Sequence, residues 1–126
     1  MSRLSIELVP RDEPTLRREI AEVRACVPFI DTINIPDIQR FSLRSCAAAR
    51  IAEPDFKSVI PHSRAIEVDP HGPLPGADDP NLTEILIVKG DPPADLSRRV
   101  YPNTSDAIIR RYAREAPHLK VYAAFD

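Results

Sequence analysis

Residues 84–93, EILIVKGDPP, constrain the fold more than any other stretch of the sequence. They begin with an unbroken aliphatic run at 85–88, the pattern of a parallel strand that is covered on both faces. Gly90 then allows a sharp turn, and the two prolines after Asp91 remove backbone donors and stop strand pairing. Asp91 is therefore expected just past the carboxyl end of a buried strand, where α/β proteins bind ligands. An ordinary turn-forming aspartate is the alternative.

Strands and helices alternate along the rest of the chain. Apolar runs and alternations predict further strands over 4–10, 29–37, 56–63 and 119–126. Helical spacing predicts three helices, within 13–27, 42–53 and 104–116, each closed by a proline; Ser42 caps the second, and Thr104 or Ser105 the third. Pro61 is expected to loosen or end the pairing of its strand. This order requires a parallel sheet with right-handed crossovers.

Residues 65–83 interrupt the alternation. They contain four prolines and two glycines, which exclude a full helix where a crossover helix is due. We expect an extended surface loop, with at most a short turn near Ile66 or Leu82, that leaves thin cover on this side of the sheet. A second polar loop is expected over 95–103.

Composition narrows the class of protein. The chain has 126 residues, a net charge of -2 and 43% hydrophobic residues, which fits one domain spanning 1–126. Acidic and basic residues are interspersed, so the sequence has no positively charged patch of the kind that binds nucleic acid or an anionic membrane surface. No apolar run is long enough to cross a bilayer and the start is not a signal peptide, so we expect the cytoplasm. The spacing of Cys26 and Cys46 predicts small buried thiols rather than a disulfide or metal site.

Polar side chains occur at the ends of four predicted strands. Glu7 lies in an otherwise apolar strand, where a carboxylate is costly unless it is paired or functional. Asn34 and His62 end the second and third strands. Because parallel strands share a carboxyl edge, we expect these three residues to converge with Asp91. A salt-bridged Glu7 and a hydrogen-bonded structural His62 are the alternatives, and the neighbouring Arg64 either receives an anion or neutralises Glu67.

The four residues lie in the segments SIELVP, DTINIPD, IPHS and ILIVKGDPP. In this order, they make the chain resemble the amino-terminal half of the methylenetetrahydrofolate reductase family, a (β/α)₈ barrel. The resemblance implies an α/β fold of parallel β/α units of the TIM-barrel type, here a half-barrel of about five strands. A complete barrel needs roughly twice this length, and an open doubly wound sheet is the alternative that fits it.

The resemblance also implies a reaction. Hydride would pass from NAD(P)H, through FAD or directly, to methylenetetrahydrofolate. Glu7 would be the general acid, with a pKa raised by burial, while His62, Asp91 and Asn34 would bind the cofactor. The second strand ends without the glycine-rich turn that lies under the flavin in the family, which favours direct transfer from NADH. A truncated, catalytically silent relative that acts as a binding or interaction module, or an unrelated small α/β protein, remains an alternative.

A half-barrel has two unpaired edge strands, here the first and the fifth. It also exposes an inner face, which we expect to be an apolar patch of a kind that monomers rarely tolerate. The sequence therefore predicts a homo-oligomer or a need for the missing carboxyl-terminal half-barrel.

Overall fold

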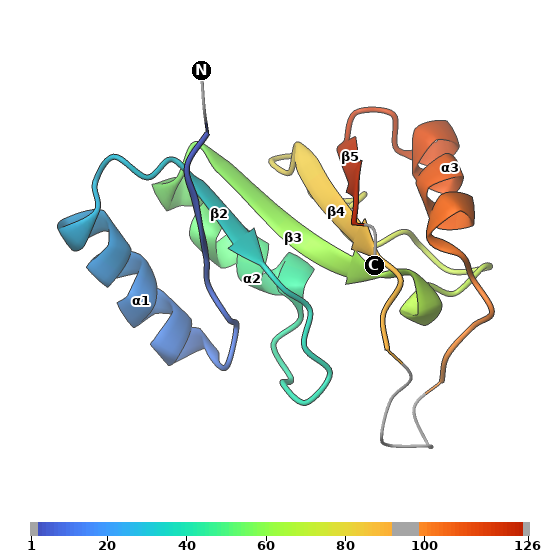
Figure 1. Cartoon of the computed structure of the whole chain (residues 1–126), viewed down its shortest axis with the longest axis horizontal. Helices are drawn as coiled ribbons and strands as arrows, with labels where there is room; N and C mark the ends of the chain where they lie inside the picture. Colours follow the sequence, from blue (N-terminus) through green and yellow to red (C-terminus); the bar gives the residue numbers. More distant parts are fainter. Residues whose placement is uncertain (1–2, 92–98, 125–126) are drawn as a thin grey trace.

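The computed structural model describes residues 3–91 and 99–124, which form an α/β fold with one five-stranded parallel sheet (Figure 1). Its elements are β1 (Ser5–Glu7), α1 (Glu13–Cys26), β2 (Thr32–Ile35), α2 (Ser45–Ala52), η1 (Glu53–Asp55), β3 (Ser58–Arg64), η2 (Ala65–Glu67), β4 (Glu84–Val88), α3 (Ser105–Glu115) and β5 (Lys120–Ala123). The strands lie in the order β1-β2-β3-β4-β5, so each pairs with its neighbours in the chain. The reversal of strand order that defines a doubly wound sheet is absent from these strands.

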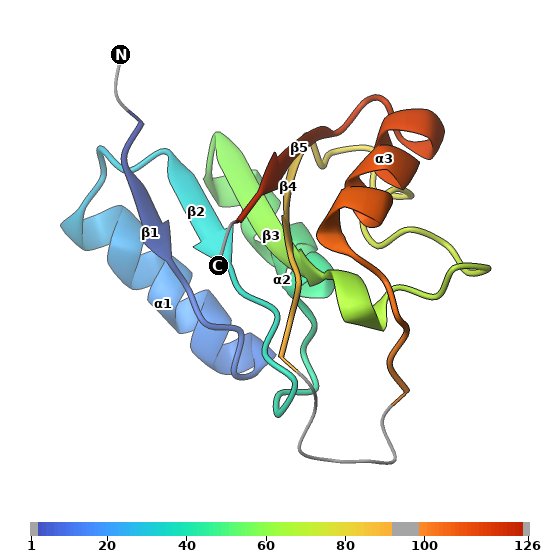
Figure 2. The ribbon, with the colours of Figure 1, turned by 45° about the vertical axis from the view of Figure 1, so that its right-hand side comes forward.

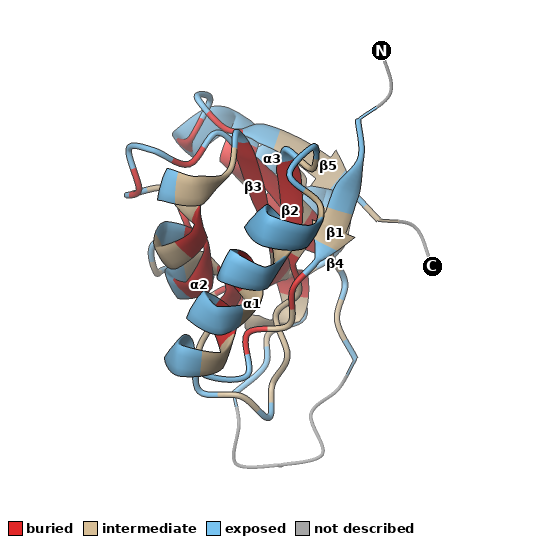
Figure 3. Cartoon of the chain, turned by 90° about the vertical axis from the view of Figure 1, so that its left-hand side faces the viewer, coloured by how far each residue is buried: buried red, intermediate tan, exposed pale blue. Residues whose placement is uncertain are grey.

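The core lies between the helices and one face of the sheet (Figure 3). Leu16 of α1, Ala48 of α2 and Tyr112 of α3 belong to one buried cluster, together with strand residues such as Ile33 and Ile85. Alternate residues of the same strands point to the opposite face, because side chains alternate along a strand. This opposite face, against which none of the described helices packs, is called the concave face below.

α3 begins where its predicted cap places it, and α1 also has a side-chain cap. The Asp12 carboxylate accepts a hydrogen bond from the Thr15 N–H at 2.7 Å at the start of α1, and the Thr104 hydroxyl accepts one from the Ala107 N–H at 3.1 Å at the start of α3. The predicted start of α2 at Ser42 is wrong. The helix begins at Ser45, whose N–H donates to the Asp37 carboxylate at 3.2 Å, so the cap comes from the loop after β2.

Pro61 divides the pairing of β3. The strand pairs with β2 from Ser58 to Pro61 and with β4 from His62 to Arg64. Pairing to β2 thus ends at the residue without an N–H, as predicted, although the strand itself continues to Arg64.

The proline-rich segment 65–83 has only one helical turn, η2, among its residues (Figure 2). The prediction of no full helix is confirmed, but the expected thin cover is wrong. Val68, Leu74 and Leu82 are buried in the core, and the Tyr112 hydroxyl donates to the Pro75 carbonyl at 2.6 Å. The segment therefore covers the sheet as a crossover helix would.

Three further expectations need correction. β4 is not covered on both faces, because Ile85 and Ile87 face the helices while Leu86 lies half-buried on the concave face. Cys26 is exposed rather than buried, and Cys46 is half-buried; both are free thiols. The strands at both ends of the chain are shorter than predicted, since β1 and β5 span three and four residues.

Residues 92–98 and 125–126 lie outside the described residues. They include parts of the predicted loop 95–103 and of the predicted last strand.

Candidate functional site

The concave face holds a hollow of about 600 Å³. Residues near both edge strands line it, from Arg3 and Ser5 on one side to Lys120 and Tyr122 on the other. The sheet therefore curls around this face. Thr32, Asn34, Ile60, Leu86 and Ala123 complete the lining. Polar side chains and the apolar Ile60, Leu86 and Ala123 thus share the lining, so the inner face is mixed rather than purely apolar.

Three of the predicted site residues form a row at the carboxyl edge of this face. Glu7 of β1 is in register with Asn34 of β2. The Asn34 Oδ1 atom lies 3.2 Å from His62 Nε2, across the pairing of β2 with β3. A carbonyl oxygen only accepts, so Nε2 is the protonated ring nitrogen and Nδ1 is left as an acceptor in the neutral ring.

The surroundings of His62 favour this neutral form. Burial lowers the pKa of His62, while the carboxylates of Glu7 and Asp37 act in the opposite direction without overcoming it. At neutral pH the ring is thus a hydrogen-bond donor toward Asn34 and an acceptor at Nδ1. The structural alternative, a hydrogen-bonded histidine, and a binding role are both compatible with this arrangement.

Glu7 differs from its expected environment. The side chain is exposed at the end of the edge strand β1, so the expectation of a buried carboxyl is wrong. The reason is that β1 has a neighbouring strand on one side only. Within residues 3–91 and 99–124, no cation lies within 4.0 Å of its carboxylate, so the salt-bridge alternative is not found either.

Asp91 lies at the same edge but does not touch this row. Gly90 has a φ of +92°, the left-handed conformation that the predicted turn requires. Past the turn, the Asp91 carbonyl accepts hydrogen bonds from the Arg64 guanidinium and, at 3.4 Å, from the Gln39 amide. The exposed Asp91 is therefore held by its backbone to β3 and to the loop after β2.

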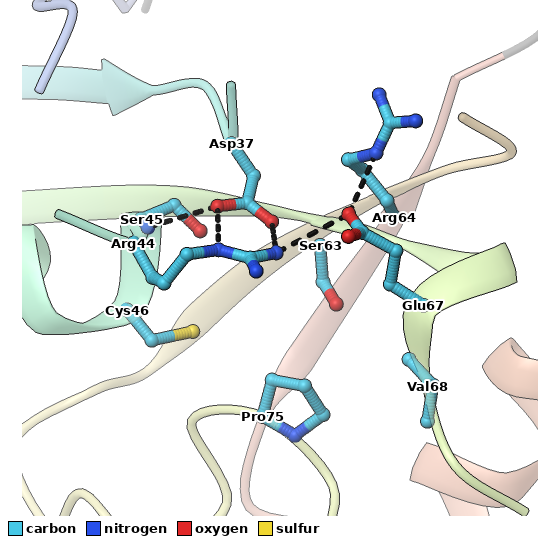
Figure 4. A pocket seen from close by; sticks show the side chains of 9 residues that line it. All are labelled: Asp37, Arg44, Ser45, Cys46, Ser63, Arg64, Glu67, Val68 and Pro75. Carbon is cyan, nitrogen blue, oxygen red and sulfur yellow. Dashed lines mark hydrogen bonds and ion pairs between the residues drawn. The ribbon is translucent and has the colours of Figure 1, made fainter. Parts of the chain in front are cut away.

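A second cavity of about 250 Å³ lies beside this edge (Figure 4). Arg44 binds both carboxylate oxygens of Asp37, with Nε at 2.8 Å from Oδ1. Glu67 bridges two guanidinium groups, at 3.2 Å from Arg44 and 2.8 Å from Arg64. The Arg64–Glu67 pair thus matches the neutralising interpretation of Arg64. Two cations and two carboxylates balance one another, and they tie the ends of β2 and β3 to α2 and η2.

Cys46 also lines this second cavity. Burial raises the pKa of its thiol to about 11, with the Asp37 carboxylate acting in the same direction. The thiol is therefore protonated at neutral pH and is a poor nucleophile. Among the described residues, no group of three or more histidine, cysteine or acidic side chains could hold a metal ion.

Sequence reasoning missed a polar network at the amino-terminal end of the concave face. The Glu84 carboxylate, 6% exposed, accepts hydrogen bonds from Arg3 at 2.8 Å, from the Tyr122 hydroxyl at 2.7 Å and from the Ser58 hydroxyl. Burial acts to raise the pKa of Glu84, but the Tyr122 and Arg3 hydrogen bonds hold it below its usual value. A glutamate directly before a buried aliphatic run was the available signal.

No protein-family model, curated protein or solved structure matches this chain. No helix in the described part of the chain is long and apolar enough to cross a membrane.

Proposed function

We propose that the chain is a methylenetetrahydrofolate reductase-like oxidoreductase unit, with its reaction site at the carboxyl edge of the concave face. The row of Glu7, Asn34 and His62 on three neighbouring strands is the observation that carries this proposal. The sequential strand order and the helices on a single face support a barrel-type β/α arrangement, in which such a row lines the end of the lumen.

The proposed reaction is reduction of the methylene bridge of methylenetetrahydrofolate. A proton delivered to N10 opens the bridge to an N5 iminium, and a hydride from C4 of NADH or NADPH adds to the exposed carbon. The products are methyltetrahydrofolate and the oxidised nicotinamide. We assign proton delivery to Glu7, whose exposed carboxyl ends the row. We assign ligand binding to Asn34, to the Nδ1 acceptor of His62 and to Asp91 at the same edge.

The turn after β2 bears on whether FAD takes part. It contains no glycine from Asn34 to Asp37, and glycines with positive φ occur at Gly76 and Gly90, not in this turn. The Asp37 carboxylate is already bound to Arg44 and the Ser45 N–H. These residues do not fit a flavin ring that lies close to the backbone of this turn. We therefore propose direct transfer from the nicotinamide and derive no step through a flavin.

The open hollow favours a second candidate, a catalytically silent relative that binds a folate-type ligand or a partner. The exposure of Glu7 supports it, because an exposed carboxyl lacks the burial that tunes many general acids. For both candidates we propose that the edges at β1 and β5 are covered by another copy or by a carboxyl-terminal half-barrel, in the cytoplasm.

The test is turnover of methylenetetrahydrofolate by the full chain with NADH deuterated at C4. The proposal expects deuterium in the methyl group of the product, read by mass spectrometry, and its loss in Glu7→Gln, because the amide keeps the shape but donates no comparable proton. Glu22→Gln is the matched control, since Glu22 is an exposed carboxylate on α1 whose Arg18 partner lies at 4.0 Å.

Four outcomes separate the candidates. Labelled product from the wild type that disappears only in Glu7→Gln supports the reductase. Saturable binding of methyltetrahydrofolate without labelled product supports the binding module. Neither binding nor product rejects both, and labelled product that survives Glu7→Gln rejects the assignment of Glu7 as the acid.

A further inference from the structure

Two carboxyl groups with a buried oxygen lie beside the same Arg50 side chain on the helix side of the sheet, away from the concave face. Glu53 opens η1 directly after α2, and Asp79 lies in the proline-rich segment with 3% of its surface exposed. One buried oxygen of each, Oε1 of Glu53 and Oδ2 of Asp79, receives no hydrogen bond from the described residues. Two ionised carboxylates here would repel each other and lack a donor. A single proton between them removes both costs.

Arg50, the nearest cation, favours the ionised forms of both carboxyl groups, but the exposed carboxylate of Asp78 shares its charge. Arg50 of α2 places its Nε 3.9 Å from Asp79 Oδ2, while its other end lies 3.2 Å from the exposed carboxylate of Asp78. Lys57 lines the same shallow hollow as Arg50 and Glu53. The second oxygen of Asp79 accepts the Asn81 N–H at 3.0 Å, which holds this carboxylate in its turn.

We propose that Glu53 and Asp79 share one proton and that this proton fastens residues 75–83 to the end of α2. The proton resides on Glu53. Burial raises the pKa of Glu53 to about 7, and the hydrogen bond and charge of Asp79 act in the same direction. Burial also acts upward on Asp79, but the hydrogen bonds from Glu53 and from the Asn81 backbone keep its pKa below the usual value.

The shared proton makes this attachment sensitive to pH. The folded protein retains a proton that an unfolded chain releases above pH 4.5, the ordinary glutamate value. The stabilisation that the protonated Glu53 gives to the folded state is therefore complete below pH 4.5 and is lost as the pH rises through about 7. Residues 75–83 supply Leu82 to the core and Pro75 to the wall of the cavity in Figure 4. Loss of the proton thus loosens one wall of that cavity.

The experiment is a carbon NMR titration of the side-chain carboxyls in the full chain, combined with amide hydrogen exchange. We expect the Glu53 and Asp79 carboxyl signals to shift together near pH 7 in the wild type. In Glu53→Gln the amide donates to Asp79 at every pH. Residues 75–83 should then exchange roughly tenfold more slowly than in the wild type at about pH 8. Glu22→Gln should match the wild type in both measurements.

Two results would overturn the proposal. One is a Glu53 signal that titrates near 4.5, as an ordinary glutamate does. The other is an exchange rate for residues 75–83 with the same pH dependence in Glu53→Gln as in the wild type. If Glu53→Gln does not fold, the titration of the wild type alone decides the question.

Discussion

Replacing Glu84 by alanine tests whether the network on the concave face holds the sheet together. The change removes the acceptor for three donors: Arg3, two residues before β1, Ser58 of β3 and Tyr122 of β5. Arg3 is 47% exposed and Tyr122 is half-buried, so both can turn to water. Ser58 is buried, and its hydroxyl loses its partner. An unsatisfied buried hydroxyl costs about 1–3 kcal/mol, and with the lost hydrogen bonds to a charged group we expect a loss of about 2–3 kcal/mol.

This loss converts to a measurable shift in the thermal midpoint. Unfolding entropy near the midpoint is about 2.1 cal/mol/K per residue, or about 260 cal/mol/K for this length. Glu84→Ala should therefore lower Tm by about 8–11 °C in calorimetry near pH 7. Tyr122→Phe should lower Tm by about 4 °C, and its effect should largely disappear in the Glu84→Ala background.

Acidification should reproduce part of this effect in the wild type. The folded protein holds the pKa of Glu84 below the ordinary value of 4.5. The contribution of ionised Glu84 to the free energy of unfolding is therefore present above pH 4.5 and is lost as the pH falls through its pKa in the folded protein. Glu22→Ala, on the exposed side of α1, is the control and should change Tm by less than about 2 °C. A Tm for Glu84→Ala within about 2 °C of the wild type would refute the reasoning.

Three further predictions concern the site and its surroundings. Glu7→Gln should lower the pKa of His62 further, because the Glu7 charge acts to raise it; NMR titration of the ring checks this, and an unchanged value contradicts it. Cys26 should react with an aromatic disulfide at least about 50-fold faster than Cys46 near pH 8, because burial keeps the Cys46 thiol protonated; equal rates would contradict this. Gly76→Ala should cost about 1–3 kcal/mol in denaturant unfolding, because Gly76 has φ +80° and a Cβ there would meet Leu82 at 2.7 Å; an unchanged midpoint would show that the turn relaxes freely.

Local signals in the sequence predicted most of the fold. Closing prolines and apolar spacing located α1 and α3, the predicted Thr104 cap marked the start of α3, and the missing N–H of Pro61 marked where β3 changes partner. The start of α2 could not be predicted in this way. Its cap is Asp37, eight residues before Ser45, and only the folded loop brings the two together.

The candidate site was predictable in its position but not in its environment. The parallel register brings Glu7 beside Asn34, as the shared carboxyl edge requires. The exposure of Glu7 follows from β1 being an edge strand. The sequence predicted that edge position, but the apolar neighbours of Glu7 favoured a buried carboxyl. Glu84 was missed because its partners Arg3 and Tyr122 are 81 and 38 residues away in the chain.

Binding of methyltetrahydrofolate to the nitrogen-labelled full chain tests the central claim most directly. Amide signals at the carboxyl ends of β1, β2 and β3, around Glu7, Asn34 and His62, should shift together and saturate, and Glu7→Gln should keep these shifts because it changes the acid rather than the binding surface. Shifts confined to the helices, or no saturable shift at any ligand concentration, would contradict the proposal that this edge of the concave face binds a folate.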